Sequence, residues 1–331
     1  MQSPPHIPLI PSNYVRPLWS VMIPTFNCAH LLRETLESVL VQDPGPDQMQ
    51  IEVVDDCSTK DDPEKVVEEV GKGRVSFYRQ PKNQGVTKNF NSCVLRSRGF
   101  FVHILHGDDL VTPAFYSTLE GLAKQFPSAA LLATRAFHID ESGEIDSLND
   151  RLPSLASPST NASPFYYNNP FRTPAMVIRR DFYETHGGFY ETLCHTADWE
   201  MWVRAIALGS GVVINRPLAK YRWFAGNDTS KLMRTGENLR DYLRLAEILT
   251  TRHPDFDMAK FRYLTARIAK HQAKRFAEKG DLAARDANQV LHDSLVIPPK
   301  RMLRRIEFAA RYRLMRPIAR MASGVLRKRA G

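Results

Sequence analysis

Short apolar runs alternate with longer amphipathic stretches along the first two fifths of the chain. The runs are rich in β-branched residues and have the length of buried strands, whereas the stretches between them carry apolar residues at helical spacing. Strands and helices that alternate in this way predict βαβ units, in a mostly parallel sheet with helices on both faces. The strands are expected at 20–24, 51–54, 74–79, 100–105 and 129–135, and the helices at 30–42, 63–70, 85–98 and 113–126.

Local signals mark where several helices begin. Asp62 and Pro63 have the residue types of an N-cap and a first helical position, and Thr112 and Pro113 repeat that pair before the helix expected at 113–126. Asp181 and Glu184 stand at the spacing of a capping box. These pairs predict the first turns of three helices.

The pattern changes after residue 135. Polar residues with Ser, Pro and Asn dominate 138–169, which predicts a long surface excursion. Strands are expected again at 173–178, 212–214 and 218–223, short helices at 181–185 and 196–207, and an almost continuous helical period beyond Asn227 with breaks near His253-Pro254, Gly280 and Pro298-Pro299. The chain therefore divides into a Pro-rich leader (1–17), an α/β domain (18–227) and a helical C-terminal extension (228–331).

Composition narrows the class of protein. The 331 residues are 43% hydrophobic and 24% charged, which is typical of a globular protein and not of a disordered one. The sequence contains no run of about eighteen apolar residues and no signal-peptide layout, so a cytoplasmic location is expected. The four cysteines have no metal-site spacing and are expected to be reduced thiols. A net charge of +9 indicates a polyanionic partner or surface.

Two of the expected strands end in paired acids. The run 100–105 stops at His106-Gly107-Asp108-Asp109, and the run 51–54 passes directly into Asp55-Asp56. Open α/β sheets bind ligands at the carboxyl ends of their strands, and carboxylates suit Mg²⁺ or Mn²⁺, which commonly bridge to phosphates. The alternative is a solvated acidic turn. Because the sequence lacks GxGxxG after the first strand and GxxxxGK[ST] anywhere, a nucleotide would be held in another way.

The ordered segments VMIPTFN, EVVDDCST, NQGVTKNFN, HILHGDD and GGF followed by ADWEMWVRA resemble family-2 glycosyltransferases with the GT-A fold, over residues 18–227. The resemblance implies transfer of a sugar from a nucleotide-sugar donor to a hydroxyl of a glycan or lipid-linked acceptor, with inversion. It also implies a Mg²⁺ or Mn²⁺ cofactor. Asp56 is similar to the family residue that binds the base, typically uracil, which favours a UDP-linked donor.

The resemblance assigns roles to individual residues. Asp198 is similar to the family's catalytic base, and Asp108 and Asp109 to its metal-binding acids. The nucleotide is expected to contact Pro24, Thr25, Phe26, Asn27, Asp55, Asp56, Lys88, Asn89, Gly107 and Asp108. The donor or acceptor sugar is expected to contact Gly187, Gly188, Trp199, Glu200 and Arg222.

Some positions depart from the family pattern or have a simpler interpretation. His106 replaces an Asp, Ala197 replaces a Glu, and Phe224 stands where many relatives carry a His, so an inactive nucleotide-binding protein is the alternative. Asp198 could serve only as a helix cap. Trp199 and Trp202, three residues apart on one helix, favour core packing, as does His103 inside its strand.

The sequence argues against two rival functions, nucleotidyl transfer and nucleic-acid binding, and it predicts a basic helix near the C-terminus. A nucleotidyltransferase would need a Gly-rich basic loop at Pro24–Asn27, and the sequence has none. From Arg301 onward the apolar residues share one helical arc and the arginines lie outside it, which predicts a basic amphipathic helix. It could dock peripherally on the anionic inner face of the cytoplasmic membrane or pack on the domain. Nucleic acid is disfavoured because few aromatic residues lie between the arginines.

Overall fold

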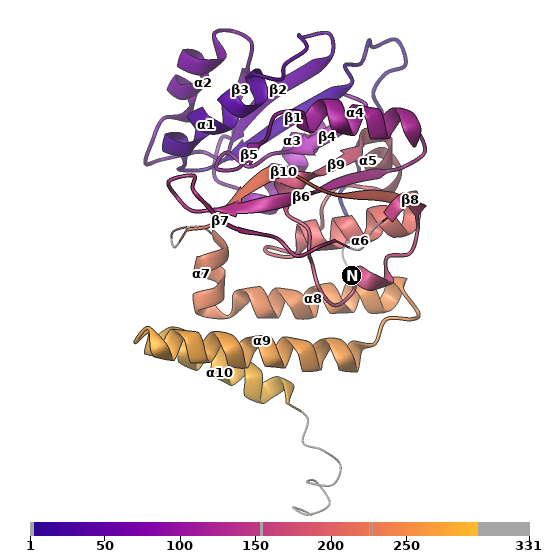
Figure 1. Ribbon diagram of the computed structural model, residues 1–331. Coiled ribbons are helices and arrows are strands. Elements are labelled where there is room, and N and C mark those ends of the chain that lie inside the picture. Colours follow the sequence, from indigo (N-terminus) through magenta and orange to yellow (C-terminus); the bar gives the residue numbers. More distant parts are fainter. Residues whose placement is uncertain (1–2, 153–154, 225, 227, 297–331) are drawn as a thin grey trace, which may run out of the picture.

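The computed structural model describes residues 3–152, 155–224, 226 and 228–296, and the ribbon in Figure 1 shows one large sheet with helices above and below it. The strands are β1 (Trp19–Thr25), β2 (Met49–Asp55), β3 (Ser76–Arg79), β4 (Phe101–Ile104), β5 (Leu110–Val111), β6 (Leu131–Ile139), β7 (Ile145–Leu148), β8 (Leu155–Ser159), β9 (Met176–Arg179) and β10 (Gly211–Arg222). The helices are α1 (Ala29–Leu40), α2 (Pro63–Gly71), α3 (Val86–Arg96), α4 (Phe115–Gln125), α5 (Arg180–His186), α6 (Ala197–Gly209), α7 (Asp228–Thr235), α8 (Glu237–Arg252), α9 (Met258–Glu278) and α10 (Leu282–Leu295), with short 3₁₀ turns η1 (Ser163–Phe165) and η2 (Thr173–Ala175).

The sheet joins a parallel half to a mixed half. Its order is β3-β2-β1-β4-β9-β6-β10-β5, with β7 added to β6 and β8 to β10. β3, β2, β1 and β4 are parallel, as the alternating pattern predicted. β9 then runs antiparallel to both β4 and β6. The tips of β1, β2 and β4 therefore lie together at one edge of the sheet.

Side chains of the central strands divide between two cores. Val21 and Ile23 of β1 pack with α1, α2 and α4, whereas Met22 between them packs with α3, α5 and α6. This alternation follows from the two-residue period of a strand, and the burial of all seven residues of β1 agrees with a sheet covered on both faces. The predicted α/β sheet with helices on both faces is thus confirmed.

Two local predictions of helix starts were wrong, each because a tertiary contact decided the structure. α4 begins at Phe115 after Ala114, and Thr112 instead donates its N–H to Leu218 beside the short strand β5. Asp181 and Glu184 form no capping box, since they pair with the arginines that precede α5 and begin it, Arg179 and Arg180.

The expected surface excursion is largely part of the fold. β6 extends through Ile139, β7 and β8 enlarge the sheet, and Phe165 is fully buried in the core. The two strands expected at 212–214 and 218–223 form one strand, β10, with shifts of register between Val213 and Ala219. Apolar side chains within the polar stretch, such as Leu152, anchor it.

The two ends of the described chain also pack on the α/β domain. Ile7 of the Pro-rich leader is fully buried in the same core as Trp202. α8 packs on that core through Leu245 and Leu249, and α9 and α10 follow beneath it (Figure 1). The predicted helix breaks at His253-Pro254 and Gly280 are confirmed, whereas Pro298-Pro299 and the basic helix predicted from Arg301 lie outside the described residues.

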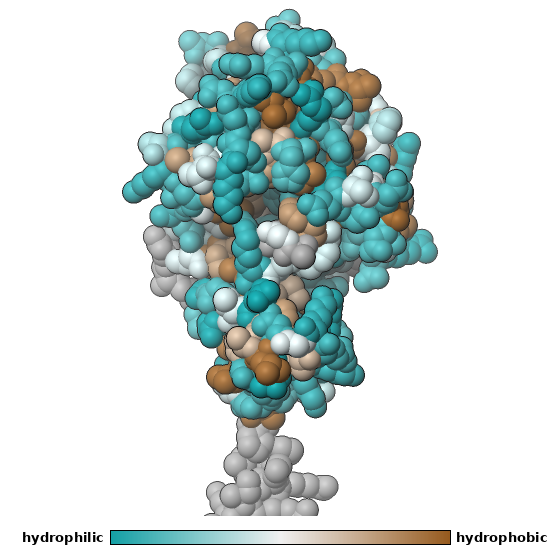
Figure 2. Space-filling view, turned by 90° about the vertical axis from the view of Figure 1, so that its left-hand side faces the viewer, coloured by the Kyte–Doolittle hydropathy of each residue, from teal (hydrophilic) through white to brown (hydrophobic). Residues whose placement is uncertain are grey.

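The face shown in Figure 2 is mainly hydrophilic, with apolar residues scattered over it. Among the described helices, none has the length and apolarity that crossing a bilayer requires.

His103 is a core residue with both ring nitrogens in use, as predicted. Nδ1 lies 3.1 Å from the Tyr116 hydroxyl and Nε2 lies 3.0 Å from the Pro174 carbonyl oxygen. Burial lowers the pKa of His103 from 6.5 to about 3. The folded protein therefore excludes a proton that the unfolded chain binds.

This imidazole gives a testable pH dependence. Its contribution to stability is present above about pH 6.5 and is lost as the pH falls toward 3, at about 1.4 kcal/mol per pH unit. Urea unfolding across this range should show a shallower loss for His103→Gln than for the wild type. The exposed His6→Gln variant should behave like the wild type. Parallel curves for wild type and His103→Gln would contradict the prediction.

Candidate active site

A cavity of about 1270 Å³ opens at the carboxyl ends of β1, β2 and β4. Asp108 and Asp198, which are ninety positions apart in the sequence, both line it. Of the residues predicted for the site, the cavity brings together Pro24, Thr25, Phe26, Asn27, Asp56, Asn89, Gly107, Asp108, Asp198, Trp199 and Arg222. Asp55, Lys88, Asp109, Gly187, Gly188 and Glu200 are not among its lining residues.

The loop after β1 is fixed by its own asparagine. Asn27 has a left-handed backbone with a φ of 52°. Its Oδ1 accepts hydrogen bonds from the N–H groups of Thr59 and Lys60, each at 2.9 Å. Asparagine tolerates this conformation better than most residues, so the sequence places a residue here that can both turn the chain and fasten it.

Asp56 lines the cavity directly after β2, beside the loop after β1. Its carboxylate accepts hydrogen bonds from the N–H groups of Gln84 at 2.8 Å and Gly85 at 2.9 Å. Burial raises the pKa of Asp56, and the two N–H groups oppose this shift. Each carboxylate oxygen keeps a free lone pair, because an ionised carboxylate can accept about four hydrogen bonds. The group can therefore still receive a donor from a ligand.

The other predicted nucleotide contacts have different surroundings. Asp55 is fully buried and pairs with Arg79 at 2.7 Å and with the hydroxyl of Ser58. Asn89 lines the cavity while its Nδ2 donates to the Val54 carbonyl. Lys88 is exposed on α3 outside the cavity lining.

Gly107 allows the loop after β4 to approach β1. A Cβ atom at this position would lie 2.9 Å from Oγ1 of Thr25 and 3.2 Å from Sγ of Cys28. Both contacts are closer than a side chain can accept without displacement of its neighbours. Glycine therefore lets the loop carry Asp108 into the cavity.

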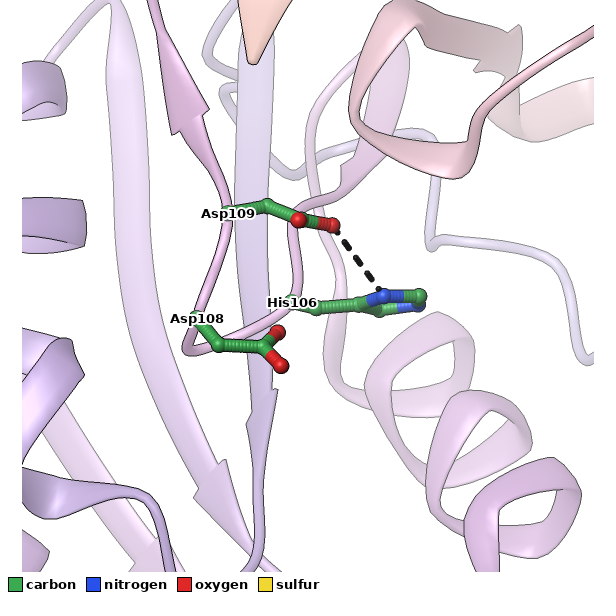
Figure 3. A group of neighbouring side chains, drawn as sticks. All are labelled: His106, Asp108 and Asp109. Atoms are coloured by element: carbon green, nitrogen blue, oxygen red, sulfur yellow. Dashed lines mark ion pairs between the residues drawn. The ribbon is translucent and has the colours of Figure 1, made fainter. Parts of the chain in front are cut away.

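His106, Asp108 and Asp109 form the acidic centre of the site (Figure 3). One ligand atom from each lies within 4.8 Å of the others, which is close enough to share a cation. Oδ2 of Asp109 lies 3.3 Å from Nδ1 of His106 but accepts no hydrogen bond, and Nε2 of His106 also has no hydrogen-bond partner. Two buried polar atoms of this group thus lack a hydrogen-bond partner.

Burial and the close approach of these charged groups shift the pKa values of Asp108 and His106. Burial and the neighbouring Asp109 raise the pKa of Asp108 above its usual range. Burial disfavours a charged His106, but Asp109 and Asp108 outweigh that effect and raise its pKa. With two carboxylates and one imidazole, the group can carry net negative charge, which a divalent cation would neutralise.

Arg222, predicted to contact a sugar, is used to hold the acidic loop. Its side chain is fully buried, and Nε donates to the Asp108 carbonyl at 2.8 Å. Nη1 donates to the Glu141 carbonyl at 2.6 Å, and Nη2 pairs with Glu34 at 2.7 Å. Its backbone N–H donates to Oδ1 of Asp109 at 2.8 Å. These bonds fix the position of the acids relative to β10.

Asp198 lies in the first turn of α6 with both oxygens accepting hydrogen bonds. Oδ1 accepts from the Trp199 N–H at 2.6 Å, and Oδ2 accepts from the Thr173 hydroxyl at 3.3 Å. Burial raises the pKa of Asp198, whereas nearby His195 opposes the shift. A carboxylate with a raised pKa that faces a cavity is suited to accept a proton near neutral pH.

Three other residues predicted to contact sugar, Glu200, Gly187 and Gly188, are partners of the buried Arg204. Glu200 is 1% exposed and pairs with Arg204 at 2.9 Å. Arg204 also donates to the carbonyl of Gly188 at 2.7 Å and to that of Gly187 at 3.2 Å. The glycines lie against the leader, and the Gly188 N–H donates to the Pro5 carbonyl. The structure gives all three a structural contact.

Several cavity residues were not singled out from the sequence, among them His195 and Arg172. His195 lines the cavity with its ring stacked on that of Tyr242, at a centroid distance of 5.9 Å. Arg172 lines it too, with Nε donating to Nε2 of His138 at 3.1 Å and Nη1 donating to the Phe171 carbonyl at 2.7 Å. Neither belongs to a recognised motif. The only sign of them in the sequence is position, because His195 stands three residues before Asp198 and Arg172 directly precedes Thr173-Pro174.

The fold and the cavity define the protein as a glycosyltransferase of the GT-A type. Strands run into a shared site lined by acids from the tip of β4 and from the start of α6, in the order that the sequence motifs predicted. The sequence model described as "Glycosyl transferase family 2" matches residues 20–187, about half of the chain, and the protein belongs to this family.

Known proteins resemble the chain to different extents. The chondroitin synthase of Escherichia coli is 28% identical over 217 residues, which are 65% of this chain and 30% of that protein. S. aureus TarS 1–349 in complex with UDP-GlcNAc superposes with a TM-score of 0.54 at 18% identity, over 83% of this chain and 90% of that one. The mannosyltransferase PcManGT of Pyrobaculum calidifontis, in complex with GDP-Man and Mn²⁺, gives 0.52 at 15% identity, over 92% and 82%. The two structures share the fold with this protein.

The buried pair of Glu200 and Arg204 gives a test of its structural role. Arg204→Met should lower the free energy of unfolding by roughly 3–5 kcal/mol, because it leaves a buried carboxylate unpaired. Adding Glu200→Gln to that variant should recover part of the loss in urea unfolding. A Glu200→Gln variant that kept its stability but lost turnover would show instead that Glu200 acts on the substrate.

Proposed function

We propose that this glycosyltransferase moves a sugar from a UDP-linked donor to a hydroxyl of a glycan or lipid-linked acceptor, with inversion, in one cation-assisted displacement. The observation that carries the proposal is the shared cavity of Asp108 and Asp198. In a cation-assisted single displacement, one carboxylate can hold the leaving group's cation and another can accept the proton of the incoming hydroxyl. The chain offers both from separate elements of the fold.

The acidic centre fits a divalent cation. Asp108, Asp109 and His106 offer ligand atoms of the types that bind Mg²⁺ or Mn²⁺, with Nε2 of His106 and Oδ2 of Asp109 both lacking hydrogen-bond partners. When bound, the ion would neutralise charge on the departing diphosphate. PcManGT, which shares the fold, binds Mn²⁺ together with its donor.

Asp198 would serve as the general base. Its carboxylate is oriented by the Trp199 N–H and the Thr173 hydroxyl, which use one lone pair of each oxygen. A remaining lone pair can accept the proton of the acceptor hydroxyl as the new C–O bond forms. Since burial raises its pKa, Asp198 is a stronger base than an exposed carboxylate.

The nucleotide would occupy the wall formed by Asn27 and Asp56. Asp56 presents free lone pairs beside the loop after β1, where the N–H of a base could donate a hydrogen bond. TarS 1–349 binds UDP-GlcNAc and PcManGT binds GDP-Man, so the fold accepts more than one base. We favour UDP because of Asp56. We also favour a cytoplasmic location, with peripheral contact to the inner membrane face through the Arg-rich sequence from Arg301.

Replacement of Asp108 tests the cation site. In thermal-shift assays, Mn²⁺ should increase the stabilisation of the wild type by UDP, and Asp108→Asn should abolish that increase. UDP release from a donor should fall roughly a hundredfold or more, because several kcal/mol of charge stabilisation are lost. The exposed Asp47→Asn variant is the control and should match the wild type. A full Mn²⁺ effect in Asp108→Asn would refute the assignment.

Replacement of Asp198 separates the base from the binding site. Asp198→Asn should reduce UDP release by roughly a hundred to ten thousandfold, while UDP and Mn²⁺ still stabilise the protein. Wild-type turnover should rise with pH as Asp198 loses its proton, since only the carboxylate can accept one. Turnover near the wild-type rate in Asp198→Asn would exclude it as the base.

A further inference from the structure

We propose that Asp241, on α8 in the C-terminal helices, is a positioning residue that holds the turn carrying His195 and thereby sets the place of Asp198. The inference rests on the proposed function, since it concerns the same base. Asp241 lies outside the residues matched by the family model and outside every motif of the sequence. Through Asp241, the helical extension has a direct part in the active site.

The carboxylate of Asp241 receives an unusual set of hydrogen bonds. Its Oδ2 accepts from the N–H groups of His195 at 2.8 Å and Thr196 at 2.7 Å, and from the Thr196 hydroxyl at 2.9 Å. Its Oδ1 accepts from the Cys194 N–H at 3.2 Å and from Arg244 at 3.1 Å. Three consecutive backbone N–H groups therefore converge on one fully buried side chain.

These bonds replace the usual cap of α6. Thr196 occupies the N-cap position, but its side chain makes no capping bond to the helix. Its hydroxyl is directed to Asp241 instead, so a residue on another helix determines where α6 begins. Asp198 follows two positions later, within the first turn. A shift of this turn would move its carboxylate directly.

α8 also shapes the cavity beside the base. Tyr242, next to Asp241, lines the cavity and stacks on the His195 ring with an interplanar angle of 12°. Leu245 and Ala246 further along α8 are fully buried in the main core. Because α8 is anchored in the core, the hydrogen bonds of Asp241 hold the turn at 194–196 against a fixed helix.

The discriminating experiment compares Asp241→Asn with Glu247→Gln, an exposed carboxylate on the same helix. The amide keeps the size of the side chain but replaces one acceptor oxygen with a donor facing N–H groups. We expect UDP release to fall tenfold to a hundredfold in Asp241→Asn, because small misplacements of a catalytic group have effects of this size. Stabilisation by UDP and Mn²⁺ should persist, and Glu247→Gln should match the wild type.

Two milder substitutions at Thr196 test the same turn if Asp241→Asn does not fold. Thr196→Val removes only the hydroxyl bond and should lower turnover to a smaller extent, and Thr196→Ser should restore it. Hydrogen exchange gives a readout that does not depend on turnover: the amides of Cys194, His195 and Thr196 should exchange at least tenfold faster in Asp241→Asn than in Glu247→Gln.

The outcomes separate this inference from the proposed function. Unchanged amide exchange, or turnover in Asp241→Asn within twofold of Glu247→Gln, would overturn the positioning role. Loss of nucleotide stabilisation together with turnover would also overturn it, because the residue would then support the fold in general. If the wild type released UDP from no donor while the amides still exchanged as expected, the proposed function would fail and the positioning of the turn would stand.

Discussion

The site depends on a carboxylate that is buried at the tip of β4 and must find partners there. Asp109 receives the Arg222 N–H from β10, and the Arg222 side chain in turn donates to the Asp108 carbonyl. A buried charge without such bonds would be strongly unfavourable. The requirement therefore fastens the parallel half of the sheet to the mixed half, and it leaves the Asp108 side chain directed at the cavity.

The parallel half of the fold could be predicted because its information is local. Apolar runs, helical periods and the Asp62-Pro63 cap each depend on neighbours in the sequence, and α2 does begin with Asp62 accepting from the Lys65 N–H. The second half depends on contacts over long separations. Thr112 is recruited by Leu218, and residues of the polar excursion pair with β6 and β10. Composition alone cannot show such pairing.

Of the residues predicted for the site, some line the cavity and others do not, for a similar reason. Acids that follow strands must gather at one edge of a parallel sheet, so Asp56 and Asp108 could be predicted from the sequence. Neighbours within a motif need not share a direction. On α6, Asp198 and Glu200 are two positions apart and thus about 200° apart around the axis, so one faces the cavity and the other faces Arg204. His195 and Arg172 depend on the packing of α8 and β6, which no motif records.

The unbalanced charges of the cavity are the strongest physical sign of a binding site. Several other buried acids are paired: Asp55 with Arg79, Glu200 with Arg204, and Asp241 with three N–H groups and Arg244. Around His106, buried atoms of an acid and of its neighbour, Oδ2 of Asp109 and Nε2 of His106, both lack hydrogen-bond partners. Folding alone would favour replacing such a group with apolar side chains. Its presence beside a large cavity is explained if a cation and a phosphate-bearing ligand complete the set of contacts.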